Sequence, residues 1–141
     1  MKKLILLLFV TGSLPAITLT ELTRCIEFVE SSYNEKAYNA SEEAVGCLQI
    51  RPVMLADYNR ITGDSMVMAD LWDRDNSYKV AKAVFKHYMK YIDNPSAKHL
   101  AFIWNGGGNA RKRVDNPQDD QKQRNLERYW KKVKAQIDTL D

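Results

Sequence analysis

Cysteine and histidine are scarce in this chain of 141 residues, which contains two of each: Cys25, Cys47, His87 and His99. Structural metal sites are built from clusters of such residues, so their number and spacing predict neither a metal site nor a cofactor. Each histidine stands alone in a helical pattern and is interpreted as an ordinary surface or core residue. In an exported protein the two cysteines can pair, and two buried free thiols are the alternative that the residues leave open.

Long hydrophobic runs are also missing. The apolar run at residues 4–10 is about seven residues long, too short to span a bilayer. Lys2 and Lys3 precede this run and small, turn-forming residues follow it, which is typical of a secretory signal peptide. We therefore expect a signal peptide at residues 1–16 and a mature domain at 17–141. The protein would be exported to the periplasm, the cell envelope or the exterior, without a membrane span after the signal is removed.

Strong net charge is absent once this segment is set aside. Lys2 and Lys3 are two of the 21 basic residues, so 19 remain against 18 acidic residues, a net charge of +1. Such a balance gives no reason to expect a nucleic-acid partner. Basic residues gather only at 111–134, where nine Lys or Arg face four Asp or Glu. This segment suits an anionic polymer or, more simply, forms a solvated helix face.

No internal repeat, Gly/Ser linker or low-complexity block interrupts the rest of the chain, whose length suits one domain. Apolar residues recur at helical spacing between a few glycines and prolines, which predicts a mainly α fold. Ser96 and either Asn76 or Ser77 are expected caps. Pro52 is the expected first residue of a helix that Gly63 would end. The expected helices begin after Thr18 or Thr20 and cover about 52–62, 78–92, 97–104 and 125–137, with a short irregular or β segment near 44–50.

One glutamate in the first expected helix has an unusual place. At about 100° per residue, Leu22, Cys25, Ile26 and Val29 form an apolar stripe, and Glu30 falls at its border. Glu21 and Glu27 point further from the stripe and are expected to be solvated. Partial burial and the C-terminal end of the helix dipole both favour the protonated form of Glu30, so we expect its pKa to be raised.

Three short motifs then follow in order. They are "ESSYN" from Glu30, "AVGCLQI" with Gly46 and Gln49, and "AFIWNGGGNA" with Asn105; "RYWKKV" carries Tyr129 near the end. In order and spacing they resemble the signature of the soluble lytic transglycosylase family of the lysozyme-like superfamily. The resemblance covers nearly all of the chain after residue 16. Cys47 and Leu48 depart from the usual Leu-Met, and Trp104 stands where the family usually has tyrosine.

The resemblance implies a lysozyme-like helical domain that cuts the β-1,4 bond between N-acetylmuramic acid and N-acetylglucosamine in peptidoglycan. Glu30 matches the catalytic acid, and Ser31, Gln49, Asn105 and Tyr129 match substrate-site positions. The expected product has a 1,6-anhydro-muramoyl end, formed without metal or cofactor. The expected partner is the peptidoglycan glycan strand, bound by a monomer.

Two alternatives stay open. A hydrolytic lysozyme needs a second carboxylate, and Glu43, and less so Glu42, lies in the loop expected to approach Glu30. A wall-binding module with the fold but without turnover is the other.

Overall fold

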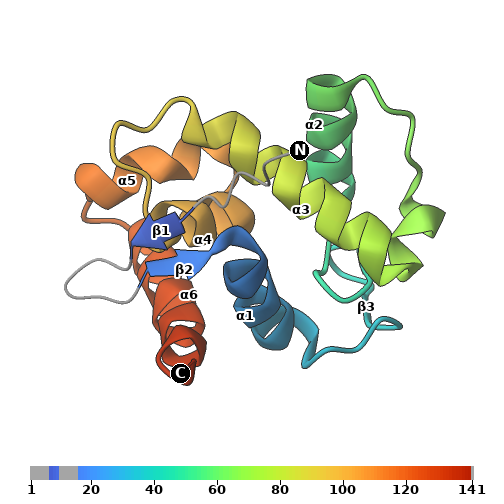
Figure 1. Ribbon diagram of the computed structural model, residues 1–141, viewed down its shortest axis with the longest axis horizontal. Helices are drawn as coiled ribbons and strands as arrows, with labels where there is room; N and C mark the ends of the chain where they lie inside the picture. The colour runs from blue at the N-terminus through green and yellow to red at the C-terminus, as the bar shows by residue number, and fades with distance from the viewer. Residues whose placement is uncertain (1–6, 10–15, 141) are drawn as a thin grey trace. The chain divides into compact units, whose positions relative to one another are not determined.

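The computed structural model describes residues 7–9 and 16–140 (Figure 1). The expected signal peptide lies largely outside these residues. The described part is mainly α, as predicted, and no helix in it is long and apolar enough to cross a membrane. The α-helices are α1 (Leu19–Ser31), α2 (Pro52–Thr62), α3 (Arg74–Met89), α4 (Ala97–Gly106), α5 (Lys112–Asp115) and α6 (Gln121–Ile137). The 3₁₀ helices are η1 (Met68–Trp72) and η2 (Gly108–Arg111), and the strands are β1 (Leu7–Phe9), β2 (Ala16–Thr18), β3 (Tyr38–Asn39) and β4 (Ala44–Val45).

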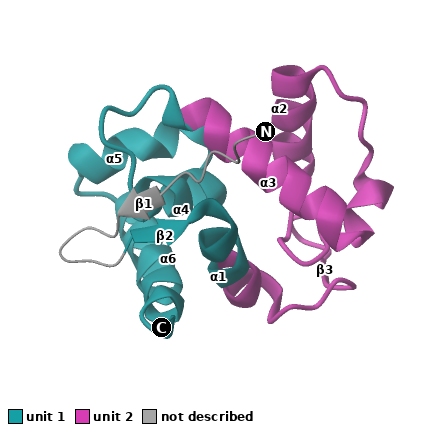
Figure 2. Ribbon diagram, viewed as in Figure 1, with its two compact units in different colours: residues 1–25, 89–141 teal, residues 26–88 magenta. Residues whose placement is uncertain are grey.

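The chain divides into two compact units (Figure 2). Unit 1 consists of Met1–Cys25 and Met89–Asp141, and unit 2 of Ile26–Tyr88. Helix α1 therefore contributes its first half to unit 1 and its second half to unit 2.

In unit 1, α4 is the buried helix, and it contacts α5, α6 and η2. Its sequence is apolar on nearly every side, which is the pattern of a helix that others surround. Gly106 at its end permits close packing, since a Cβ there would lie 2.8 Å from Cδ2 of Leu126 on α6. Strands β1 and β2 pair antiparallel, with Leu7 opposite Thr18.

Unit 2 holds the short β segment that the sequence predicts near 44–50. Strands β3 and β4 form an antiparallel pair with Tyr38 opposite Val45, and β4 contacts η1. The turn that follows β4 returns to it through an isolated bridge between Val45 and Ile50. The largest fully buried side chains of this unit are Ile26, Leu48, Ile50, Tyr58, Leu71 and Phe85.

Several predicted helix ends are confirmed. The backbone N–H and side chain of Thr18 form a reciprocal capping pair with Glu21, at 2.9 and 3.1 Å. Ser96 caps α4 together with His99, which is buried and also contacts Asp115 through Nε2. Pro52 begins α2, and Gly63 ends it in the left-handed conformation.

Two predicted starts are wrong by four residues. Helix α3 begins at Arg74 because the Asp73 carboxylate accepts from the N–H of Asn76, while Ser77 is buried inside the helix and donates to the Leu71 carbonyl. Helix α6 begins at Gln121 because Asp120 accepts from the N–H of Gln123. In both cases an acidic residue in an apparently loop-like polar stretch is the cap.

Cys25 and Cys47 are both buried free thiols. Burial, followed by the negative charge of Glu21, raises the pKa of Cys25 to about 11. Burial, followed by Glu27, raises the pKa of Cys47 to about 11 as well. Both thiols therefore stay protonated near neutral pH and are poor nucleophiles.

Gly46 is expected to be the glycine least tolerant of substitution. It has φ of +81°, and a Cβ would overlap the carbonyl oxygen of Leu71, so Gly46→Ala should destabilise the protein by about 3 kcal/mol or more. Gly63→Ala is a matched control, because Gly63 has φ of +75° with open space around it; about 1–2 kcal/mol is expected there. Urea unfolding measures both, and equal losses would contradict the overlap with Leu71.

Candidate active site

The end of α1 carries the first motif. Glu30 and Ser31 are the last two residues of the helix, and Glu30 is half-buried, as its place at the border of the apolar stripe predicts. The Ser31 hydroxyl donates to the Cys47 carbonyl at 2.7 Å. The residue after the candidate acid therefore joins the end of α1 to the second motif.

The second motif is a tight turn held by its own glutamine. The N–H of Gly46 donates to the Ala37 carbonyl at 2.9 Å. The Gln49 Nε2 donates to the same Ala37 carbonyl at 3.1 Å and to the Gly46 carbonyl at 2.9 Å. Both amide hydrogens of Gln49 are thus used within the protein, which leaves its Oε1 as the side-chain atom suited to a ligand.

Backbone strain concentrates in these motifs. Ser32 and Tyr33, directly after α1, have φ of +53° and +67°, and Glu43 and Gln49 have φ of +53° and +52°. These are the non-glycine residues with positive φ in the described part of the chain, and all four lie in unit 2. Each costs about 1–2 kcal/mol, and strain of this kind gathers at functional sites.

Glu27 corrects the sequence-based expectation. The helical projection predicts a solvated carboxylate, but Glu27 is only 2% exposed. Arg74 Nε and Nη2 donate to its Oε2 at 3.0 and 2.9 Å, and the Tyr78 hydroxyl donates to its Oε1 at 2.6 Å. The prediction was wrong because α1 buries a wider arc than its apolar stripe, and a buried carboxylate is tolerated when charged and polar partners surround it.

Arg74 extends this cluster to the loop after Glu30. Its Nη2 also donates to the Tyr33 carbonyl at 3.0 Å, and its Nη1 donates to Glu35 at 2.8 Å. Hydrogen bonding to Glu27 raises the pKa of Arg74 above its usual range, so the guanidinium remains charged. Arg74 thereby contacts the chain on both sides of Glu30, three residues before it and three residues after it.

The remaining predicted residues belong to other elements of the fold. Glu42 and Glu43 are exposed in the loop before β4. Asn105, half-buried at the end of α4, and Tyr129, buried on α6, belong to unit 1, whereas Glu30, Ser31 and Gln49 belong to unit 2. Trp104 is buried, only 2% exposed. In residues 7–9 and 16–140 no group of three or more His, Cys, Asp or Glu is arranged to hold a metal ion.

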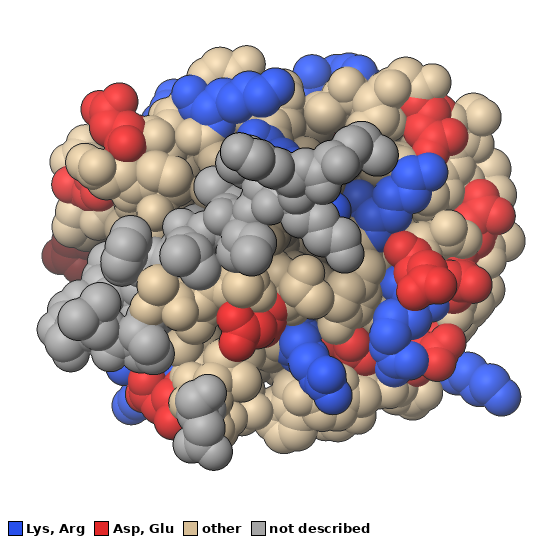
Figure 3. Space-filling view, in the orientation of Figure 1, with Lys and Arg blue, Asp and Glu red and all other residues tan. Residues whose placement is uncertain are grey.

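The ion pairs of the basic segment 111–134 support the simpler of the two interpretations given above, a solvated helix face. Arg113 pairs with Asp120 and Arg124 with Asp119, and Lys134 just at its end pairs with Asp138. The face in Figure 3 likewise shows both basic and acidic side chains. Such pairing is typical of a solvated surface.

Sequence reasoning missed Arg74, Tyr78 and Glu27 as a group. Glu27 and Arg74 are 47 positions apart, and no local pattern links them. One weak signal exists. Thr23 lies one turn before Glu27 on the same face of α1, and both are buried, so this face of the helix is buried although its residues are polar.

Residues 17–126 match the family model described as the transglycosylase SLT domain, which covers most of the chain. No curated protein and no solved structure matches the chain. The chain therefore belongs to the transglycosylase SLT domain family, a lytic-transglycosylase-type family that acts on peptidoglycan, and its mainly α fold is that of the lysozyme-like superfamily.

We expect Arg74→Met to destabilise the protein by about 2–4 kcal/mol, because it leaves the Glu27 carboxylate buried without a cation. The loss should be smaller than the largest losses seen when one partner of a fully buried ion pair is removed, since Arg74 is itself 37% exposed. Adding Glu27→Gln to Arg74→Met should recover much of the loss. Thermal and urea unfolding measure each step.

Arg60→Met is the control for this experiment, because Arg60 pairs with Asp57 at the surface. Its effect should be much smaller. A loss for Arg74→Met no larger than that for Arg60→Met would contradict the role given to the buried pair.

Proposed function

We propose that this protein is a lytic transglycosylase that cleaves the β-1,4 bond from N-acetylmuramic acid to N-acetylglucosamine, with Glu30 as its catalytic carboxyl. The observation that carries the proposal is the family match over residues 17–126, together with Glu30 on the end of α1 and its neighbour Ser31 joined to the motif turn at Cys47. A half-buried carboxyl on a rigid helix end is suited to general acid and base chemistry.

The reaction needs one carboxyl in two roles. Glu30, protonated when substrate binds, gives its proton to the glycosidic oxygen as the bond from that oxygen to C1 of the muramoyl sugar breaks. Glu30, now a carboxylate, takes the proton of the muramoyl 6-hydroxyl, whose oxygen bonds to C1. The products are a free 4-hydroxyl on one sugar and a 1,6-anhydro ring on the other, and no water is consumed.

Gln49 is proposed to bind substrate through Oε1. Because its Nε2 is occupied by Ala37 and Gly46, the side chain would accept a hydrogen bond, from an N-acetyl N–H or a sugar hydroxyl. Ser31 would act on the substrate indirectly, since its hydroxyl is committed to the Cys47 carbonyl. It is best described as a positioning residue for Glu30.

Asn105 and Tyr129 are included in the proposal because they match the family's third motif and last-helix tyrosine. Asn105 is the last residue but one of α4 and is half-buried, and Tyr129 is 8% exposed on α6. Each side chain is carried by a helix and has a polar end, an amide or a hydroxyl, that can hydrogen-bond a sugar.

Hydrolysis with Glu43 as second carboxylate is the competing chemistry. Glu43 is exposed and has φ of +53° in the motif loop, so its backbone is held in an unusual conformation. A muramidase would place water where the transglycosylase uses the 6-hydroxyl, and its products would have reducing ends.

Export through a signal peptide at residues 1–16 completes the proposal. The family match begins at residue 17, directly after the expected cleavage region. Peptidoglycan lies outside the cytoplasm, so an enzyme of this family acts there.

Digestion of purified peptidoglycan tests the function. We expect anhydro-muramoyl ends, identified by mass spectrometry, from the native protein and at least about 1,000-fold slower release by Glu30→Gln, because the amide cannot transfer the proton. Glu27→Gln is not a suitable control, since it disturbs the buried cluster. Glu21→Gln is suitable, because Glu21 is exposed and glutamine can still accept the Thr18 N–H in the helix cap. Reducing ends that disappear in Glu43→Gln would replace the proposal by hydrolysis, and wall binding without cleavage would replace it by a binding module.

Asn105→Ala is expected to lower kcat/KM on peptidoglycan about tenfold, the effect of one hydrogen bond lost with the substrate. Asn109→Ala is the matched control in the same glycine-rich run, since Asn109 is exposed, and it should behave as the native protein. Tyr129→Phe, which removes only the hydroxyl, should fall between them. The melting temperature of each variant reports whether a loss reflects folding, and equal rates for Asn105→Ala and Asn109→Ala would remove Asn105 from the site.

A further inference from the structure

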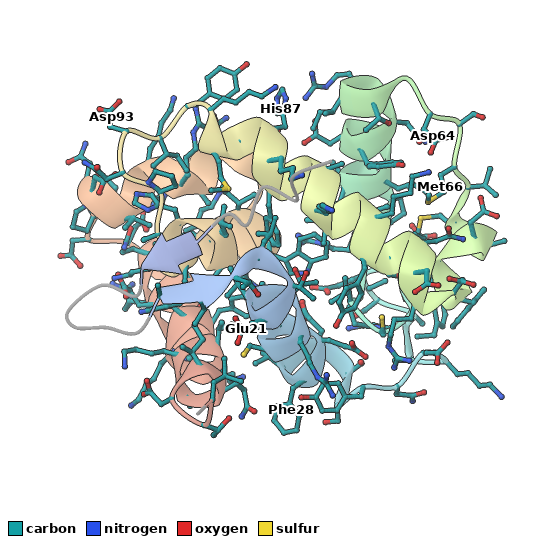
Figure 4. The ribbon with its side chains drawn as sticks, viewed as in Figure 1. Glu21, Phe28, Asp64, Met66, His87 and Asp93 are labelled. Atoms are coloured by element: carbon teal, nitrogen blue, oxygen red, sulfur yellow. The ribbon has the colours of Figure 1, made fainter. Side chains whose placement is uncertain are left out.

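Exposed aromatic side chains gather on unit 2. The rings of Phe28 and Tyr33 lie 5.5 Å apart, and those of Tyr38 and Trp72 lie 6.3 Å apart. All four are exposed, Trp72 by 41% and Tyr33 by 44%. Phe28 projects from the end region of α1 (Figure 4). Aromatic rings cost free energy in water, so a group of them on one surface points to a ligand.

Two of these rings line a pocket with polar neighbours. The pocket has a volume of about 510 Å³ and is lined by Tyr33, Asn34, Glu35, Lys36 and Trp72. Within the described residues, the Lys36 ammonium has no ion-pair partner and the Trp72 indole N–H has no acceptor. Glu35 is different, because its carboxylate accepts a hydrogen bond from Arg74 at 2.8 Å. The pocket therefore offers two aromatic faces, hydrogen-bond donors and one unpaired cation.

The loop that forms the pocket is ordered by internal hydrogen bonds. Arg74, held by the buried Glu27, donates to the Tyr33 carbonyl. The N–H of Asn34 donates to the Ser31 hydroxyl at 3.1 Å, and the N–H of Lys36 donates to Asn34 Oδ1 at 2.9 Å. A pocket built in advance loses little conformational entropy when it binds a ligand.

We propose that this aromatic pocket binds a sugar ring of the peptidoglycan strand, with its apolar face against Trp72 and Tyr33, and that Lys36 binds a carboxylate carried by the strand's peptide. The inference rests on the proposed function, which supplies the glycan as substrate. It adds a second point of attachment in the loop that directly follows Glu30.

The chemistry of the pocket favours this ligand. A pyranose ring presents C–H groups on its face and hydroxyls at its edge, which match an aromatic ring bordered by donors. Peptidoglycan stems carry carboxylates, which match the unpaired Lys36. Glu27 and Glu35 share the single positive charge of Arg74, so with Lys36 these four groups have no net charge. Sugar stacking therefore provides the binding, and the exposed Lys36 adds selectivity for strands that carry peptide.

Binding to the full-length Glu30→Gln protein tests the pocket without turnover. The probes are a neutral β-1,4-linked N-acetylglucosamine tetramer and a disaccharide-peptide fragment with free carboxylates. Trp72→Ala should weaken the binding of both about tenfold. Lys36→Gln should weaken the fragment about threefold, an effect lost at high salt, and leave the tetramer unchanged.

Two controls match these changes. Lys82→Gln removes an exposed lysine of the same unit, and Tyr91→Ala removes an exposed aromatic ring of unit 1. Both should bind as the Glu30→Gln parent does. Melting temperatures identify any variant that fails to fold.

The unmutated Trp72 ring provides a readout that does not depend on the folding of a Trp72 or Lys36 variant. In the Glu30→Gln parent, added tetramer should shift the NMR signal of the Trp72 indole N–H, whereas Trp104 and Trp130 are buried at 2% and 7% exposure and should move little. An unmoved Trp72 signal, or equal affinity in folded Trp72→Ala, overturns the pocket.

The two proposals fail separately. Cleavage of peptidoglycan by the native protein with an unmoved Trp72 signal would leave the proposed function and remove the pocket. Tetramer bound at Trp72 without any cleavage by the native protein would remove the enzyme and leave the pocket.

Discussion

The buried carboxylate of Glu27 is the constraint on which the rest of unit 2 depends. A carboxylate at 2% exposure requires a cation and hydrogen-bond donors, and Arg74 and Tyr78 provide them. Because Arg74 begins α3 and also donates to the loop after α1, one guanidinium aligns a helix start with a helix end. Glu30 lies in the sequence between Glu27 and Tyr33, two of the residues that Arg74 contacts. The ion pair at Glu27, three residues away, therefore helps to fix the backbone at Glu30.

The motif turn adds a second fixed point at the same helix end. Gly46 approaches the Leu71 carbonyl too closely for any side chain, Gln49 uses its amide hydrogens to close the turn, and Ser31 joins the turn to α1. Positive φ at Ser32 and Gln49 shows that the backbone is held against its own preference. In the proposed mechanism a single carboxyl acts first as acid and then as base, and it would need such rigidity because both proton transfers depend on its distance from the sugar.

The proposed aromatic pocket is suited to a polymeric substrate such as the peptidoglycan strand. The proposed catalytic carboxyl and a few hydrogen bonds would bind a flexible strand weakly, whereas a second attachment at the proposed pocket would raise the effective concentration of the next sugar. The same Arg74 that neutralises Glu27 also holds the Tyr33 carbonyl and Glu35. The proposed catalytic residue and the proposed pocket, both in unit 2, thus share one buried support.

The sequence by itself determined the mainly α fold, the helix ends at Ser96 and Gly63, the family through its ordered motifs and the border position of Glu30, because each follows from local spacing or a short motif. It narrowed the first cap to Thr18 or Thr20. Tertiary structure alone decided that Glu27 is buried, since the cation that permits this lies 47 positions away. It also decided that Gln49 directs its amide hydrogens inward and that Trp72 joins Tyr33 at one pocket. Acidic caps at Asp73 and Asp120 extended two helices beyond their predicted starts, because a cap depends on backbone geometry that composition does not reveal.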